Sequence, residues 1–226
     1  MNSKRDVESR GDAKADALTA RGHRIRPLNP DSAEEIELVA TRMRLTLMEV
    51  LGEETGGSYY TMDWLRERVR WHLDPASSKA RILLAVDGGG HMAGHTIVRV
   101  EREESGRVFG LFATTFVEPE SRQQAMADHL LLAGEAWMKT QGLTVAATDT
   151  SRKNTPLIQL YRKHGYEIIE TADDMIGWAV HSSDRAAPSV TRRSPPRLRS
   201  PRECRKAIAP CPPPSAHGRR AADRKA

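Results

Sequence analysis

Apolar residues follow two kinds of spacing along this chain. Stretches rich in β-branched residues, or alternating between apolar and polar positions, predict strands at residues 23–28, 81–87, 91–100, 107–117, 143–148, 166–170 and 175–180. Stretches with apolar residues three or four positions apart predict helices with inner faces from Ile36 to Val50, Trp64 to Leu73 and Ala127 to Met138. With a further short helix before Gly165, the predicted order is β-α-α-β-β-β-α-β-α-β-β.

Capping signals mark the ends of these helices. The expected N-caps are Ser32, Asp63, Ser121 and Thr155. Gln124 follows Ser121 by three residues, which is capping-box spacing, so the third long helix should begin directly after Ser121. Gly142 follows the last apolar position of that helix and suits a left-handed residue at its C-terminal end.

Residues 107–117, the helix that follows them and residues 143–148 form a predicted β-α-β unit. Two parallel strands joined in this way make a right-handed crossover. The N-terminus of the helix then lies at the C-terminal edge of the sheet. Because that end carries about half a positive charge and several free N–H groups, it attracts phosphate.

Four pieces of sequence occur in a defined order over this region. They are Val117-Glu118-Pro119, Arg122-Gln123-Gln124-Ala125-Met126-Ala127, Asn154, and Leu160-Tyr161-Arg162-Lys163-His164-Gly165-Tyr166. Together they resemble the acetyl-CoA-binding half of the GNAT-type N-acetyltransferase superfamily, which shows V-x-P, Q/R-x-x-G-x-G/A, an Asn and L-Y-R-K-x-G-F/Y. The resemblance implies an α/β (α+β) fold with helices on both faces of a mixed, mostly antiparallel sheet of about six or seven strands, including a splayed parallel pair.

The resemblance implies acetyl-CoA as co-substrate and no metal. The residues expected to bind it are Thr115, Phe116, Val117, Arg122, Gln123, Gln124, Ala125, Met126, Ala127 and Asn154. The backbone N–H groups from Gln123 to Ala127 would hold the pyrophosphate. Ala125 stands where the family has its first Gly and adds a methyl group at a point of close approach. We expect pyrophosphate binding to survive, with a catalytically degenerate site as the alternative.

Tyr161 is the expected catalytic acid for the departing thiolate, since the family places a Tyr at this point of its motif. A packed core tyrosine is the alternative. Glu118, at the end of its strand, is the candidate base. His95, Glu53 and Glu54 are other candidates for that role, and removal of the proton through water needs no dedicated base.

Gly52 to Met62 reads as a loop with two Gly and two Tyr, followed by a helix. The resemblance places this region at one wall of the acceptor pocket. The candidate substrate-binding residues are Glu53, Glu54, Tyr59, Tyr60 and Trp64. Ordinary packing and a solvated acidic loop are the alternatives.

Charge divides the 226 residues unevenly. Residues 181–226 hold 12 Lys and Arg against 3 Asp and Glu, a net charge of +9, whereas the rest holds 23 against 27, a net charge of −4. We expect a flexible leader over residues 1–22, an acetyltransferase domain over 23–180, and a disordered, basic, Pro- and Arg-rich tail over 181–226. The acidic domain favours a small cationic amine as acceptor. A peptide or protein amine, or a non-catalytic module acting through the tail, is the alternative.

Other classes of protein are disfavoured by composition. The two cysteines, Cys204 and Cys211, both lie in the tail, so the expected domain carries no disulfide framework and no Cys-based zinc site. No apolar run is long enough for a transmembrane helix, and the charged N-terminus is not a secretory signal, so a cytoplasmic location is expected. The tail lacks interleaved aromatic residues, which argues against nucleic acid as a partner. Homodimerisation is left open.

Overall fold

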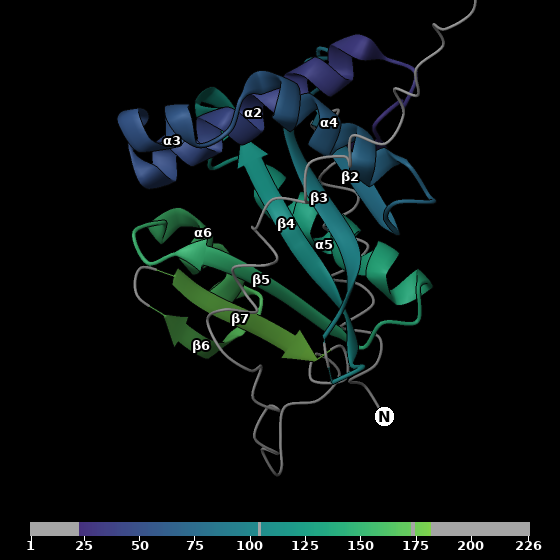
Figure 1. Cartoon of the computed structure of the whole chain (residues 1–226), viewed down its shortest axis with the longest axis vertical. Helices are drawn as coiled ribbons and strands as arrows, with labels where there is room; N and C mark the ends of the chain where they lie inside the picture. The colour runs from purple at the N-terminus through teal and green to yellow at the C-terminus, as the bar shows by residue number, and fades with distance from the viewer. Residues whose placement is uncertain (1–22, 104, 173–174, 182–226) are drawn as a thin grey trace, which may run out of the picture.

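One seven-stranded sheet organises the computed structural model, which describes residues 23–103, 105–172 and 175–181 (Figure 1). Its strands lie in the order β1-β2-β3-β4-β5-β7-β6. They are β1 (Arg24–Pro27), β2 (Ala80–Val86), β3 (Met92–Arg102), β4 (Val108–Val117), β5 (Val145–Ser151), β6 (Glu167–Ala172) and β7 (Met175–His181). The β4–β5 pair is parallel and the other neighbouring strands are antiparallel, which confirms the expected mixed sheet. The leader and tail lie outside the described residues, apart from His181, which ends β7.

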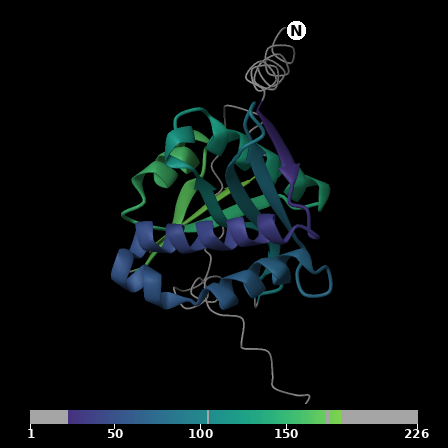
Figure 2. The ribbon, with the colours of Figure 1, turned by 90° about the horizontal axis from the view of Figure 1, so that it is seen from above.

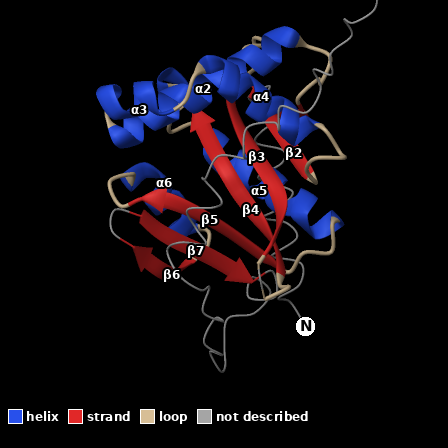
Figure 3. Ribbon diagram, viewed as in Figure 1, coloured by secondary structure: helices blue, strands red, loops and turns tan. Residues whose placement is uncertain are grey.

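Five α-helices and one 3₁₀ turn are described (Figure 3). They are α2 (Ala33–Leu51), α3 (Glu53–Tyr59), α4 (Met62–Leu73), the 3₁₀ turn η1 (Pro119–Ser121), α5 (Met126–Thr140) and α6 (Thr155–Lys163). The prediction of a loop from Gly52 to Met62 was wrong, because α3 occupies most of that stretch. Glu53 and Glu54 form its first turn, where negative charge stabilises a helix. None of the described helices is long and apolar enough to cross a membrane.

The helices cover both faces of the sheet. On one face, α2 and α4 pack against β2 and β3 through a core that includes Val39, Leu65 and Ile97. Figure 2 shows α2 running across the sheet with α3 and α4 beside it. On the other face, α5 and α6 share a core with β4 that includes Leu131 and Phe112. Central strands covered on both sides account for continuous apolar runs such as that of β2.

Side-chain caps set several helix boundaries. Ser32 accepts a hydrogen bond from the N–H of Glu35, which confirms it as the N-cap of α2. Two other N-caps lie one or two residues before the expected ones. Thr61 rather than Asp63 caps α4, and Asn154 rather than Thr155 caps α6, because their side-chain oxygens accept N–H groups of the first turn. Gly142 has a φ of 73°, as its predicted role requires.

The parallel strands β4 and β5 remain together over a short distance only. Their register joins Gly110 to Ala146, Leu111 to Ala147 and Phe112 to Thr148, and these described strands pair no further. Beyond this point β4 runs toward α2 while β5 runs toward α6 (Figure 1). The separation begins beside a bulge, since Val98 of β3 pairs with Phe112 and Ile97 pairs with Thr114. The predicted splayed pair is therefore present.

The contact between α2 and α3 provides a test of this packing. A Cβ at Gly56 would lie 2.3 Å from the backbone oxygen of Leu47, so Gly56→Ala must push the two helices apart. We expect the free energy of unfolding to fall by about 1–3 kcal/mol, the usual effect of overpacking. Urea-induced unfolding measures this change.

The matched control is Gly57→Ala, one residue further along α3. Its Cβ would come no closer than 3.9 Å to the neighbouring Nη2 of Arg44, and Ala favours a helix over Gly by about 1 kcal/mol. Gly57→Ala should therefore leave stability unchanged or raise it. Equal destabilisation by both substitutions would contradict the close approach of α2 and α3.

Candidate active site

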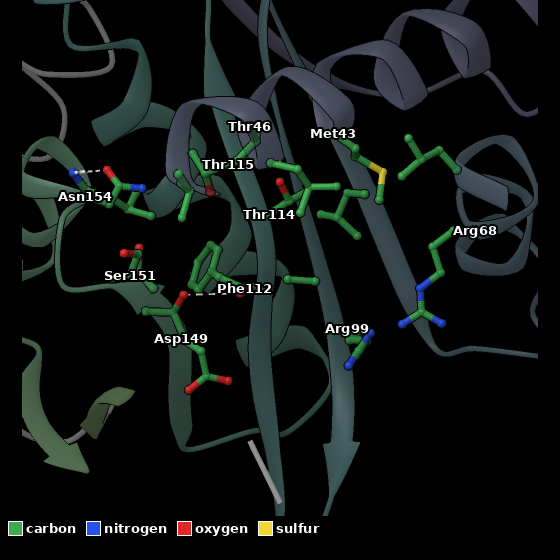
Figure 4. A pocket seen from close by; sticks show the side chains of 18 of the residues that line it. Met43, Thr46, Arg68, Arg99, Phe112, Thr114, Thr115, Asp149, Ser151 and Asn154 are labelled. Carbon is green, nitrogen blue, oxygen red and sulfur yellow. Dashed lines mark hydrogen bonds between the residues drawn. The ribbon is translucent and has the colours of Figure 1, made fainter. Parts of the chain in front are cut away.

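A pocket opens where β4 and β5 separate. It contains about 980 Å³ of empty space, part of which is open to solvent. Its walls come from α2, α4, α6 and strands β3, β4 and β5 (Figure 4). The lining residues are Met43, Thr46, Leu47, Val50, Tyr60, Trp64, Leu65, Arg68, His72, Ile97, Arg99, Phe112, Ala113, Thr114, Thr115, Thr148, Asp149, Thr150, Ser151, Asn154, Leu157 and Tyr161. Because they come from both faces of the sheet, the pocket passes between the strands.

Tyr161 of α6 lies at the point where the strands separate. Its side chain is 1% exposed and packs at an angle against Phe112, with ring centroids 6.2 Å apart. Burial raises the pKa of Tyr161 to about 12, although hydrogen bonding with Thr148 of β5 and Thr115 of β4 acts in the opposite direction. The phenol therefore keeps its proton at neutral pH, at a site that touches both separating strands.

The loop before α5 differs from the sequence prediction. Ser121 ends the turn η1 and does not cap α5, which begins five residues later at Met126. Ala125 is the N-cap residue and has a φ of 62°, and Gln123 has a φ of 63°. The capping-box prediction was therefore wrong, because the chain makes a loop with two left-handed residues before the helix starts. Such loops gather backbone N–H groups into concave sites that bind anions.

Arg122 fixes the start of this loop. Its Nε donates to the carbonyl oxygen of Val117 at 3.1 Å, and its two Nη groups bind Glu49 of α2 at 3.2 and 3.0 Å. On the far side of the loop, the side-chain amide of Gln124 donates to the carbonyl oxygen of Glu120 at 3.1 Å. These contacts are made by the side chains of Arg122 and Gln124, and they do not use the backbone N–H groups of the loop.

Asp128 lies in the first turn of α5, where a free carboxylate would repel a bound phosphate. Its Oδ1 is 2.7 Å from Nζ of Lys163 and 2.7 Å from Nε2 of His164, both at the end of α6. Burial acts to raise the pKa of Asp128, but hydrogen bonds from Lys163 and His164 lower it overall. The charge of Asp128 is thus balanced locally, and it ties α6 to α5.

Glu118, the candidate base, lies at the end of β4 and is not among the residues that line the pocket. Its Oε1 is 2.7 Å from Nη2 and 2.9 Å from Nε of Arg42, a side chain of α2 that is 1% exposed. Arg42 also donates to the carbonyl oxygen of Met92. These contacts give Glu118 a structural role in joining α2 to the ends of β3 and β4.

His95, an alternative base, is fully buried and also lies outside the pocket lining. It packs against Phe116 at 6.2 Å between ring centroids, and no hydrogen bond to either ring nitrogen is found within the described residues. Burial, reinforced by the positive charge of Arg42, lowers the pKa of His95 to about 3. His95 is therefore a neutral core residue.

The structure brings two of the five candidate substrate residues into the pocket. Tyr60 and Trp64 line it and stack on each other with ring centroids 4.0 Å apart. Glu53 and Glu54 are exposed on α3 and are not part of the lining. The side chain of Tyr59 lies outside the described part of the structure.

The charged lining residues Arg68, Arg99 and Asp149 were not predicted. Signals for them exist in the sequence. Arg68 and His72 follow Trp64 at intervals of four, so they share its face of α4, and Arg99 interrupts the apolar run of β3 between two valines. An arginine in such a buried pattern needs a partner or a ligand.

Comparison with known proteins now decides the family. The sequence model described as the Acetyltransferase (GNAT) family matches residues 45–166, more than half of the chain. This chain belongs to the GNAT acetyltransferase family. Membership in this family of acyltransferases confirms the enzyme class that the motifs indicated.

One curated protein and two solved structures illustrate what this GNAT protein is similar to. A mycothiol acetyltransferase from Pseudarthrobacter chlorophenolicus is 34% identical over 94 residues, which are 41% of this chain and 28% of that protein. The chain thus spans less than a third of that relative. The structure of yncA from Salmonella typhimurium with its cofactor acetyl-CoA has a TM-score of 0.55 at 15% identity, covering 75% of this chain and 99% of the other. A GNAT acetyltransferase from Streptococcus pneumoniae has a TM-score of 0.51 at 20% identity, covering 70% and 99%.

The buried histidine of this GNAT domain leads to a prediction about pH. Because the pKa of His95 is about 3 in the folded protein and about 6.5 in an unfolded chain, only the unfolded chain binds this proton as the pH falls below 6.5. Stability supplied by His95 is therefore present above pH 6.5 and lost toward pH 3. His95→Leu should reduce the slope of unfolding free energy against pH by about 1.4 kcal/mol per pH unit between pH 5.5 and 4.

Urea unfolding measured at several pH values gives this slope. His91→Leu is the control, since the His91 side chain is 66% exposed at the hairpin turn. It should leave the slope close to that of the unmodified protein. Parallel pH profiles for His95→Leu and the unmodified protein would contradict a buried neutral histidine.

Proposed function

We propose that this protein transfers the acetyl group of acetyl-CoA directly to a primary amine of a small molecule. The observation that carries the proposal is the position of the Tyr161 phenol, buried at the point where β4 and β5 separate. The phenol lines the pocket together with Thr115 of β4, and the chain that continues from β4 leads to the start of α5. Each part suits one requirement of acyl transfer from a thioester.

The residues present fit an extended cofactor with a diphosphate. Beyond Phe112, the edge of β4 is not covered by β5, so its backbone groups along Thr115 to Val117 can pair with an extended arm. The loop from Gln123 to Ala125 and the N-terminus of α5 supply N–H groups for phosphate. Asn154 lines the pocket while its Oδ1 caps α6. The yncA structure, which contains acetyl-CoA, supports the same choice for this fold.

Acetyl-CoA supplies an activated acyl group whose transfer leaves a thiolate that needs a proton. Tyr161 is the pocket residue suited to give one, because its phenol remains protonated and lies in the separation between the strands. A phenol held in the pocket is a stronger acid than bulk water, so it can donate a proton to the thiolate more readily. Glu118 is paired with Arg42, and His95 is buried outside the pocket lining, so we assign removal of the amine proton to water.

The acceptor is expected on the opposite side of the sheet, between α2, α4 and β3. There the pocket wall is mostly apolar, with Met43, Leu47, Val50 and Ile97 beside the stacked Tyr60 and Trp64. The net charge of −4 suggested a cationic acceptor, but Arg68 and Arg99 outnumber Asp149 among the charged lining residues. The charges that line the pocket therefore do not favour a cationic acceptor.

Binding of acetyl-CoA is the first test. At about 100 times its dissociation constant, acetyl-CoA should raise the free energy of unfolding by roughly 2.7 kcal/mol. ADP at the same concentration is the control, since it carries a diphosphate but no arm to pair with β4, and should give a smaller shift. Thermal unfolding with each ligand, followed by thiol release in the presence of amines, measures both steps. No shift at millimolar acetyl-CoA would overturn the proposal.

Replacement of the catalytic phenol is the second test. Tyr161→Phe removes the proton donor and keeps the packing against Phe112, so we expect kcat to fall by roughly 10²-fold or more. Steady-state thiol release measures this loss.

Tyr166→Phe is the matched control for Tyr161→Phe. Tyr166 is also buried, and its hydroxyl donates to Glu135 at 2.9 Å, but it does not line the pocket. Tyr166→Phe should lower stability by about 1–3 kcal/mol while kcat changes little. If Tyr161→Phe behaves like Tyr166→Phe, Tyr161 is a structural residue.

A further inference from the structure

Two arginines from different elements lie at one end of the pocket. Arg68 comes from α4 and Arg99 from β3, and both line the cavity at the end away from Asn154 and Ser151 (Figure 4). The same indole anchors both, since the Cζ atoms of Arg68 and Arg99 lie 4.2 and 6.0 Å from the centre of the Trp71 ring. Two like charges are thus gathered at a site that faces the interior of the pocket.

The surroundings hold these cations in place. Arg99 is 4% exposed, and its Nε donates to Glu101 at 2.7 Å. His72, next to Trp71 on α4, lines the same end, is 3% exposed, and finds no hydrogen-bond partner for Nδ1 among the described residues. Burial, followed by the charges of Arg68 and Arg99, lowers the pKa of His72 well below its ordinary value. His72 therefore stays neutral, and it offers a polar ring beside the two guanidinium groups.

The charges that line the pocket are distributed unevenly. Among the described lining residues, Arg68, Arg99 and Asp149 carry a formal charge at neutral pH. Asp149 lies on β5 directly after Thr148, whereas Arg68 and Arg99 come from α4 and β3. Guanidinium groups bind carboxylate and phosphate in bidentate geometry and are less strongly hydrated than ammonium groups, so they suit anion binding inside a partly buried cavity.

From this arrangement we propose that the acceptor amine carries an anionic group, a carboxylate or a phosphate, which Arg68 and Arg99 bind while the amine faces Tyr161. This inference rests on the proposed acetyl transfer and names its substrate class. The apolar wall between the two ends, including Leu47 and Ile97, contacts the body of the acceptor. Asp149 attracts the ammonium end and so orients the molecule.

Matched pairs of amines test the proposal. With acetyl-CoA and the full chain, L-phenylalanine should be acetylated with at least tenfold higher kcat/KM than L-phenylalaninamide, or phosphoethanolamine with at least tenfold higher kcat/KM than ethanolamine. Which pair responds distinguishes carboxylate from phosphate. Acetylation of the neutral and anionic members at equal rates would overturn this inference and leave the proposed function intact. Thiol release with none of these amines would contradict the proposed function instead.

Binding measured without turnover separates the two claims further. Isothermal titration should show N-acetyl-L-phenylalanine or N-acetyl-phosphoethanolamine, the product of the preferred pair, binding at least tenfold more tightly than its neutral counterpart. Equal affinities, or no binding of either anionic product, would overturn the assignment of an anion site at Arg68 and Arg99.

Single substitutions test whether Arg68 and Arg99 bind the anionic group of the acceptor. Arg68→Gln should raise KM for the preferred anionic amine at least tenfold, with kcat changed less and with the neutral counterpart little affected. Arg99→Gln should do the same, and Arg68→Gln remains informative if the buried Arg99 variant fails to fold. Arg70→Gln is the control, because Arg70 lies on the outer side of α4, where it pairs with Glu67 at 2.6 Å. Loss of the same size in all three variants would contradict a specific anion site.

Discussion

The early separation of two parallel strands is the constraint on which this site depends. A backbone edge that leaves its neighbour carries polar groups that must find other partners. Here β4 and β5 pair from Gly110 to Phe112 and then part, beside a bulge that redirects β4. The separation also gives the phenol of Tyr161 contact with both strands. One irregularity in the sheet thus accounts for the groove, the polar edge and the position of Tyr161.

Charge in this protein has to be considered locally. The net charge of the expected domain is negative, and that net charge led to the prediction of a cationic acceptor. The acidic side chains nearest the site, however, are mostly used in structural contacts. Glu118 pairs with the buried Arg42, Glu49 pairs with Arg122, and Asp128 pairs with Lys163 and contacts His164. Because paired charges partly cancel at short range, the field inside the pocket depends mostly on the groups that line it, of which Arg99 is itself paired with Glu101.

Much of the fold could be predicted from the sequence, because its period-two and helical patterns reflect burial that the sheet imposes. Helix boundaries that depend on backbone conformation could not be predicted from the sequence. The start of α5 was misplaced because Ser121 with Gln124 has the spacing of a capping box, while a loop with left-handed residues leaves no comparable signal. Of the candidate site, Tyr161 was predicted from a motif of fixed spacing, and it lines the pocket. Arg68 and Arg99 were missed because their meeting depends on how α4 crosses β3, which no local pattern encodes.

The loop before α5 also bears on whether the site is active. A left-handed conformation costs a residue with a Cβ about 1–2 kcal/mol, and both Gln123 and Ala125 adopt it. Strain of this kind persists only where the surroundings enforce it. Here Arg122 anchors one side of the loop at Val117 and Glu49, and the packed first residue of α5, Met126, holds the other. The retained strain therefore fits the proposed role of this loop in phosphate binding.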